Sequence, residues 1–507
     1  MILKLILLIV FFAIMVGVGF YSRRHATNVN DFVLGGRTVG PWLTAFAYGT
    51  SYFSSVVFVG YAGQFGWKYG LSATWIGIGN AIIGSLLAWI VLGRRTRVMT
   101  NHLSSATMPE FFSKRFESHS LKISASVIIF VFLIPYTASV YNGLSRLFSM
   151  AFDVPYKVCI VVMALLTAVY VIAGGYMATA INDFIQGIIM ILGIIAVIAA
   201  VLNGQGGFIE AVGKLAQFES DIDVTLGQPG AFTSFFGPDP VNLLSVVILT
   251  SLGTWGLPQM VHKFYAIKDE QSIKTGTIIS TAFAVIVAGG SYFLGSFVRL
   301  FDDASLHNES GGMIFDAIMP HMLSTLPDIL VGIVVVLVLS ASMSTLSSLV
   351  LTSSSTMTLD LIKDTLVKNM SEKKQLVTMR VLIAFFIIVS VTLALNPPTF
   401  IAQLMGISWG ALAGAFLGPF IYGLYWKKTT KISVWASFIV GIGITLANMF
   451  LNFTSPITAG ALAMLSSLVV VPLVSLFTPK LTEESTDAIF ECYTETVIVS
   501  KKKSLEP

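Results

Sequence analysis

The stretch Leu339–Thr358, LSASMSTLSSLVLTSSSTMT, decides how the rest of the chain is interpreted. It lies between the apolar run Ile329–Val338 and the charged end Asp360–Lys363, so we expect it at membrane depth. Yet 12 of the 19 residues from Ser340 to Thr358 are Ser or Thr. Hydrocarbon tolerates so many hydroxyls only where they bond inward, to backbone, to another helix or to a ligand.

Two interpretations of these hydroxyls remain open. On a helix, one face would carry Ala341, Ser344, Thr345, Ser348, Thr352 and Ser355. A row of neutral oxygens suits a hard cation such as Na⁺, which takes oxygen ligands as Ca²⁺ and Mg²⁺ do. The other interpretation is a tightly packed helix whose hydroxyls bond the carbonyls one turn back.

The composition is that of a polytopic membrane protein. Of the 507 residues, 55% are hydrophobic and 11% are charged, whereas about 25% are charged in a soluble protein. The net charge of +4 does not indicate a nucleic-acid partner, because the basic residues lie between apolar runs. The two cysteines form neither a metal-binding pattern nor a disulfide framework.

The hydropathy pattern predicts thirteen segments long enough to cross a bilayer core of about 30 Å. They cover approximately residues 5–20, 41–66, 72–93, 121–149, 157–174, 179–202, 240–261, 275–300, 328–358, 378–395, 399–425, 432–453 and 456–478.

Charge then orients these segments. Arg23 and Arg24 follow the first apolar run, so we interpret that run as a retained span with its N-terminus outside. With this orientation 24 of the 30 lysines and arginines, Lys263 among them, fall on the inner side. This is the bias of the positive-inside rule, and we expect a plasma-membrane protein with a cytoplasmic C-terminus.

The sequence offers no pattern for ATP-driven transport or for hydrolysis. It contains no GxxxxGK[ST] run, no HExxH and no Ser-His-Asp arrangement, and its six histidines fall in loops or at span ends. We therefore expect neither a soluble catalytic domain nor an enzyme.

Two spans carry signals of a broken helix. The second, PWLTAFAYGTSYFSSVVFVGYAGQFG, is interrupted by Gly and hydroxyl residues around Gly49–Ser55, and the seventh contains Gly253–Gln259 with a proline. A broken helix offers bare carbonyls to a cation and bare amides to an anion. The alternative for the second span is a Gly/Ser packing face.

Spans two to six and seven to eleven make two sets of five, each opening with an interrupted helix. This arrangement indicates an inverted repeat with the binding site between the halves. The expected organisation is a first helix and inner loop (1–30), a first repeat (31–203), a second repeat (240–427), two extra helices (428–478) and a cytoplasmic tail (479–507).

Two predictions follow from the placement of polar residues in the spans. Asp183 lies just inside the sixth span, where it is either a functional carboxylate or a helix-start acid. If the two breaks face one another, the solute pocket contains Tyr48, Ser51, Tyr52, Thr254, Trp255 and Gln259. Gln403 either closes this pocket from outside or bonds a neighbouring helix.

Several stretches together resemble the sodium/solute symporter family. They are Asp31–Arg37, Ala173–Ala178, Asn182–Gln186, Ser342–Ser348 and Thr358–Asp360. Within that family, Ser344–Leu346 and Gly256–Pro258 look most like the sodium/proline branch. The resemblance implies an all-α fold of the amino acid-polyamine-organocation transporter type, in which an inverted five-helix repeat with discontinuous helices carries extra helices.

The resemblance also implies ion sites. The first sodium ion would be held by the carbonyls of Thr50, Phe53 and Ala341 and by the hydroxyls of Ser344 and Thr345. Some family members have a second sodium site, and the matching residues here are Asp183, Ser344, Ser347 and Ser348.

The solute is less closely defined than the ion. Sodium/proline carriers have an aspartate where this chain has Tyr52, and aromatic residues where it has Thr250 and Thr254. We expect sodium-coupled uptake, by alternating access, of a small organic solute, either a proline-like amino acid or a monocarboxylate. The alternatives are a proton-coupled carrier, for which only Asp183 could titrate at an ion site, and a non-transporting sensor on the same fold.

Overall fold

The computed structural model describes residues 2–22, 28–219, 230–367 and 369–498, and within these ranges the chain is helical and forms no β-sheet. The α-helices are α1 (Ile2–Ser22), α2 (Val29–Leu34), α3 (Pro41–Tyr52), α4 (Ala62–Tyr69), α5 (Thr74–Gly79), α6 (Arg94–His102), α7 (Met108–Arg115), α8 (His119–Phe152), α9 (Tyr156–Gly204), α10 (Phe208–Leu215), α11 (Pro240–Gly256), α12 (Pro258–Ala266), α13 (Glu270–Phe283), α14 (Gly290–Gly295), α15 (Phe315–Ser324), α16 (Asp328–Thr356), α17 (Glu372–Leu395), α18 (Ile401–Tyr425), α19 (Lys431–Leu451), α20 (Pro456–Phe477) and α21 (Glu483–Ile498).

Shorter stretches of other helical types connect them. The π-helical ones are η3 (Val56–Tyr61), η5 (Asn80–Leu87), η6 (Trp89–Gly93), η8 (Ala284–Gly289) and η11 (Met357–Leu366). The 3₁₀ turns are η2 (Gly35–Arg37), η4 (Gly70–Ala73), η7 (Ala231–Thr233), η9 (Val298–Phe301) and η10 (Ala304–Leu306).

The expected count of thirteen spans is not confirmed. In the part of the chain that the structure describes, 10 helical runs are long and apolar enough to cross a membrane, or 11 if α11 and α12 form one bent span. The second expected span is divided, because α3 has only 12 residues and its continuation runs on into the third as Val56–His102. The apolar part of the fifth, Tyr156–Val169, is shorter than the rest.

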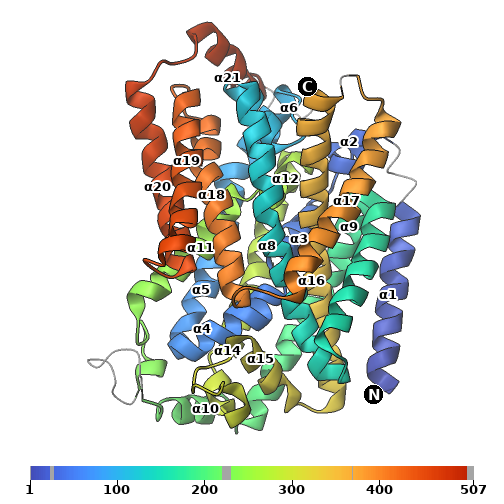
Figure 1. Cartoon of the computed structure of the whole chain (residues 1–507), viewed down its shortest axis with the longest axis vertical. Coiled ribbons are helices and arrows are strands. Elements are labelled where there is room, and N and C mark those ends of the chain that lie inside the picture. The colour runs from blue at the N-terminus through green and yellow to red at the C-terminus, as the bar shows by residue number, and fades with distance from the viewer. Residues whose placement is uncertain (1, 23–27, 220–229, 368, 499–507) are drawn as a thin grey trace.

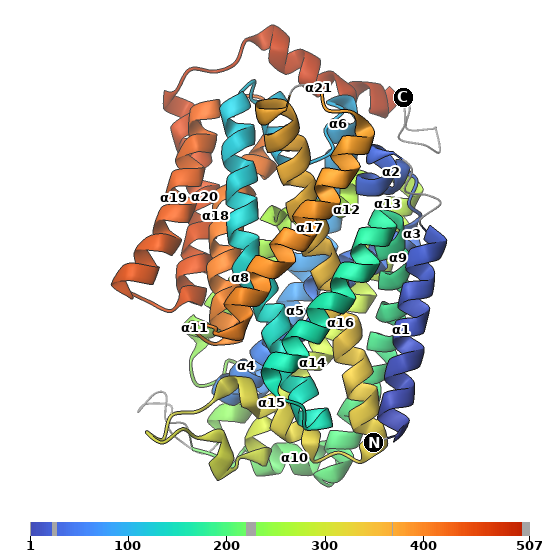
Figure 2. The same cartoon turned by 45° about the vertical axis from the view of Figure 1, so that its right-hand side comes forward.

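The long helices run along one axis and leave the two termini at opposite ends of the molecule (Figure 1). We call these the α10 end, where the N-terminus lies, and the α21 end. Helix α21 lies across the helices at its end (Figure 2). Basic residues gather there on α6 and α7: Arg94, Arg95, Arg97, Lys114 and Arg115.

Burial separates interior helices from peripheral ones. In α16 and α18, 78% and 89% of the apolar window is buried, whereas the value is 22% in α1 and 28% in α17. Helix α16 packs against α3, α8, α9 and α1. Its many hydroxyls therefore face protein rather than lipid, as the sequence requires.

The C-terminal helix α21 is held against the basic helices α6 and α7 by cation–π contacts. The guanidinium of Arg95 lies 4.0 Å from the ring centre of Tyr425 and 4.5 Å from that of Tyr493, which belongs to α21. Arg115 lies 5.0 Å from the Phe490 ring. These cation–π contacts dock α21 onto the basic helices at this end.

Candidate functional site

The second span breaks where the sequence predicts it. Helix α3 ends at Tyr52 because Phe53 adopts extended backbone (φ −88°, ψ 114°), and helical geometry resumes at η3. A Cβ on Gly49 would lie 2.4 Å from the Phe283 ring, so only glycine allows this close packing on α13. The last carbonyls of a helix lack intrahelical amide donors, which leaves that of Thr50 available to other groups.

The seventh span breaks in the same manner. Leu257 adopts extended backbone (φ −81°, ψ 123°) between α11 and α12, whose axes differ by 45°. Pro258 supplies no backbone N–H and begins α12, which is a favourable position for proline. Both halves of the chain thus contain a discontinuous helix, as expected.

The break in α3 and the middle of α16 bring five oxygen atoms together. The Ser344 hydroxyl lies 3.0 Å from the carbonyl oxygen of Thr50 and 2.9 Å from that of Ala341. The Thr345 hydroxyl lies 3.2 Å from the Thr50 carbonyl, 3.1 Å from that of Ala341 and 3.4 Å from that of Phe53. These are the five atoms expected for the first sodium ion.

The chemistry of this set fits a monovalent hard cation. Ser344 and Thr345 are buried, and none of the five oxygens carries a formal charge. Each hydroxyl can rotate to present a lone pair to an ion instead of its proton to a carbonyl. Over the described ranges no group of three His, Cys, Asp or Glu residues could hold a metal ion.

Elsewhere on α16 the packing interpretation applies. The hydroxyls of Ser354 and Ser355 donate to the carbonyls of Leu351 and Thr352, each at 3.2 Å. The Thr358 hydroxyl bonds the Ser354 carbonyl at 2.8 Å. Each of the two interpretations therefore describes a different part of the helix, and Ser344 and Thr345 are the hydroxyls that reach the carbonyls of the broken span.

The residues expected at a second sodium site lie together, but with a lysine among them. The Lys263 ammonium donates to the Ser348 hydroxyl at 3.0 Å and lies 3.9 Å from the Asp183 carboxylate. Ser348 also bonds Ser51 at 2.8 Å, while the Ser347 hydroxyl bonds back to its own helix at 2.8 Å. We expected Lys263 among the lysines of the inner loops and span ends; the structure shows that it is 2% exposed and belongs to α12.

Three of the expected solute residues use their polar atoms to join spans. The Tyr48 hydroxyl and the Thr254 hydroxyl both donate to the carbonyl of Gly84, at 2.8 and 3.0 Å. The indole N–H of Trp255 donates to the Ile83 carbonyl at 2.9 Å. The π-helical geometry of η5 accounts for these free carbonyls, because π-bulges disrupt the regular helical hydrogen bonds.

Tyr52 belongs to a buried group that the sequence reasoning missed. The Tyr52 and Tyr292 hydroxyls both lie near the Asn80 amide. The Tyr52 and Tyr136 rings pack on Trp409, with centroids 6.4 and 5.8 Å from its own. We call these five residues the aromatic–amide cluster. Asn80 could have been found, because an amide inside an apolar run is a functional candidate.

The amide oxygen of Asn80 accepts a hydrogen bond from Ser251 at 3.2 Å, but five other polar atoms of this cluster lack well-formed hydrogen bonds. They are the hydroxyls of Tyr52, Tyr136 and Tyr292, the amide nitrogen of Asn80 and the indole nitrogen of Trp409. Both amide atoms of Gln259, at the start of α12, are likewise buried without a partner. Because buried polar groups in folded proteins are normally satisfied, such a concentration indicates a place for a bound polar molecule or water.

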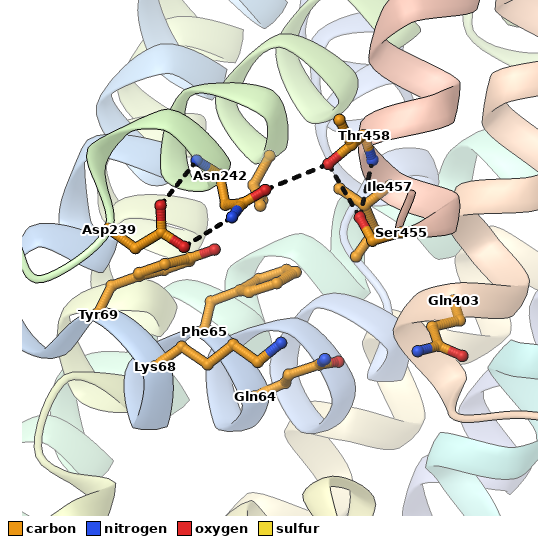
Figure 3. Close-up of a pocket in the computed structure, with 11 residues that line it drawn as sticks. Gln64, Phe65, Lys68, Tyr69, Asp239, Asn242, Gln403, Ser455, Ile457 and Thr458 are labelled. Atoms are coloured by element: carbon orange, nitrogen blue, oxygen red, sulfur yellow. Dashed lines mark hydrogen bonds between the residues drawn. The ribbon is translucent and has the colours of Figure 1, made fainter. Parts of the chain in front are cut away.

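Gln403 lies apart from this cluster, in a pocket between α4 and the first turns of α11, α18 and α20. The pocket has a volume of about 240 Å³ and contains both a cation, Lys68, and a carboxylate, Asp239. Figure 3 shows Gln64 and Lys68 extending toward Gln403, opposite a hydrogen-bonded row that starts at Asp239. Gln403 also accepts a bond from Thr399, four residues earlier on the same segment. Both expected roles of Gln403, closing the solute pocket or bonding a neighbouring helix, stay predictions.

Comparison with known proteins shows the family of this chain. The profile of the sodium:solute symporter family matches residues 32–441. The chain belongs to this family. Its members include the osmoregulated proline transporter OpuE of Bacillus subtilis, which is 30% identical over 444 residues, or 86% of this chain and 87% of that protein. The sodium/proline symporter 2 of Staphylococcus saprophyticus is 30% identical over 445 residues, or 86% of this chain and 84% of that protein.

Solved structures confirm the fold of this symporter. A sodium-coupled sialic acid symporter in its outward-open state superposes with a TM-score of 0.76 at 19% identity, covering 95% of this chain and 99% of that one. A nucleobase-cation-symport-1 transporter gives a TM-score of 0.53 at 12% identity, over 90% and 97% of the two chains. The chain is therefore a multi-pass membrane protein for sodium-coupled solute symport.

Proposed function

We propose that this symporter imports a small zwitterionic solute, with proline as the first candidate, together with sodium bound at the break of α3. The observation that carries the proposal is the convergence of the Ser344 and Thr345 hydroxyls on the Thr50 carbonyl, at 3.0 and 3.2 Å. The names of the two bacterial relatives support proline. The solute passes unchanged, and the chain acts as a carrier rather than an enzyme.

Coupling would arise because the ion joins the two halves of the chain. Residues 31–203, which include the broken α3, would form one five-helix repeat, and residues 240–427, which include α16, would form the other. An ion that binds only when Thr50 and Thr345 are close favours the conformation in which they are close. Residues 1–30, 428–478 and the tail 479–507 would lie outside this moving core.

The solute would bind in the aromatic–amide cluster, beside the ion. The amide nitrogen of Asn80 and the hydroxyls of Tyr52 and Tyr292 offer unsatisfied polar groups, and Trp409 offers an apolar face for a ring or short chain. A few placed polar groups among aromatic side chains are typical of small-molecule sites. The pocket at Gln403 would be the entrance from outside.

We assign the α10 end to the outside of the plasma membrane and the α21 end to the cytoplasm. The basic residues on α6 and α7 support this orientation through the positive-inside rule. It places the N-terminus outside and α21 inside.

Uptake into proteoliposomes tests the proposal. Purified protein should accumulate labelled L-proline when an inward sodium gradient is imposed, and should not do so with an equal potassium gradient or an inward proton gradient. A panel of other amino acids and monocarboxylates serves as competitors. Uptake driven by protons alone would refute sodium coupling, and sodium-driven uptake of a labelled monocarboxylate without uptake of L-proline would refute the solute class.

A further inference from the structure

A lysine at membrane depth normally has a function, and Lys263 is buried at the centre of a polar group. Its ammonium donates to the Ser348 hydroxyl at 3.0 Å, faces the Asp183 carboxylate at 3.9 Å and lies 5.2 Å from the centre of the Tyr176 ring. The exposed fraction is 2% for Lys263, 0% for Asp183 and 4% for Ser348. Charged side chains are rare at such places and usually pair with one another.

Because the Lys263 ammonium and the Asp183 carboxylate carry opposite charges, the group of Lys263, Asp183 and Ser348 is neutral overall without a bound ion. Neither carboxylate oxygen of Asp183 accepts a hydrogen bond of normal geometry, so the ammonium is what balances its charge in this structure. A sodium ion brought to Asp183 and Ser348 would meet a like charge a few ångströms away. In a medium of low dielectric constant that repulsion is strong.

The Lys263 ammonium also bonds Ser348, one of the residues expected to coordinate the second sodium ion. Ser348 is already bonded to Lys263 and to the Ser51 hydroxyl. The Ser347 hydroxyl donates to the Ser344 carbonyl at 2.8 Å within α16. Of the four residues expected at a second sodium ion, the three serines therefore all have their hydroxyls engaged by the protein itself.

We propose that the ammonium of Lys263 is the resident cation of the Asp183–Ser348 cluster, and that this symporter consequently couples its solute to one sodium ion. The proposal rests on the proposed function, since the single ion is the one held by Thr50 and Thr345. Lys263 belongs to α12, Asp183 to α9 and Ser348 to α16. The positive charge thus links three helices permanently, and it is carried by the protein rather than supplied by the gradient.

Equilibrium binding of radioactive sodium to the purified full-length protein tests this inference without needing the solute. We expect one saturable sodium ion per chain in the wild type and two in Lys263→Met, because the freed carboxylate then has room for an ion. The double variant Lys263→Met/Asp183→Asn should return to one. Lys268→Met is the matched control, since Lys268 is exposed just after α12, and it should bind one ion.

The outcomes separate this inference from the proposed function. Two ions in the wild type would overturn the inference and leave the first sodium site intact. One ion in both the wild type and monodisperse Lys263→Met would also overturn it, since the ammonium would not be what excludes a second ion. No saturable sodium in the wild type would refute the proposed function itself. If Lys263→Met does not fold, Lys263→Gln replaces it, with the same expected count of two ions.

Discussion

Replacing Ser344 or Thr345 by alanine is the sharpest test of the ion site. Each substitution removes one hydroxyl from the five-oxygen group and leaves the backbone carbonyls in place. The Thr345 hydroxyl lies within 3.4 Å of three carbonyls, those of Thr50, Phe53 and Ala341, whereas that of Ser344 lies near two. Loss of Thr345 should therefore weaken sodium binding at least as much as loss of Ser344.

The size of the effect follows from the cost of an unmade polar contact. Leaving a buried polar group without its partner costs about 1–3 kcal/mol. At about 1.4 kcal/mol per factor of ten, this corresponds to roughly a 5- to 150-fold weaker affinity. We expect at least a tenfold rise in the sodium concentration that gives half-maximal uptake for Ser344→Ala and for Thr345→Ala.

The assay is the initial rate of labelled L-proline uptake into proteoliposomes as external sodium is varied. The matched control is Ser354→Ala, which deletes an equally buried hydroxyl of α16 that bonds only the Leu351 carbonyl, at 3.2 Å. Thr345→Ser keeps the hydroxyl and should retain most of the affinity. If uptake by Ser344→Ala and Thr345→Ala is half-maximal at the same sodium concentration as uptake by Ser354→Ala, the ion does not bind between α3 and α16.

The remaining predictions concern charge, the solute and pH. Asp183→Asn should lower uptake while expression survives, because it leaves a buried ammonium without its counter-charge. Thr254→Ala and Trp255→Ala should raise the solute concentration for half-maximal uptake, whereas Trp75→Ala, whose indole bonds a loop carbonyl, should not. Burial raises the pKa of Asp316 from 3.8 to about 6, so the folded protein retains a proton that the unfolded chain releases. The free energy of unfolding should therefore fall as pH rises from about 4 to 6, and thermal denaturation of Asp316→Asn in detergent should show less of this fall.

Each of these has a contrary result. Wild-type uptake and sodium dependence in Asp183→Asn would show that the Asp183 carboxylate has no part in transport. Equal effects of the Thr254, Trp255 and Trp75 substitutions would mean general packing damage. The breaks in the second and seventh spans would then not line the solute pocket. An unchanged pH profile in Asp316→Asn would show that its carboxyl titrates normally.

The broken helices could be predicted from the sequence because their causes are local. Proline at 258 lacks an amide hydrogen, and the glycine and hydroxyls around residue 49 lower the cost of leaving helical geometry. The hydroxyl-rich stretch likewise had to face inward, since lipid satisfies no hydrogen bond. The structure agrees with both arguments at Phe53, Leu257 and α16.

Features that depend on distant partners could not be predicted in this way. From hydropathy we expected the seventh span to end at residue 261, with Lys263 beyond it on the inner side. In the structure α12 continues to Ala266, and Lys263 is buried against α9 and α16. The role of Asn80 depends on tyrosines from other spans. The docking of α21 depends on aromatic rings that meet arginines far away in the sequence.

The two polar centres of α16 differ in how their charge is balanced, and this difference explains why only one would respond to the gradient. At Asp183 and Lys263 a fixed negative charge faces a fixed positive one. At Thr50 and Thr345 only neutral oxygens and the negative end of the α3 dipole are present, so positive charge must come from outside. Such a site would bind a cation reversibly, because hydroxyl protons can replace it on the carbonyls when it leaves. Ion binding and the geometry of the break would therefore be linked, and by reciprocity a conformational change that reshapes the break toward the inner side would also weaken sodium binding.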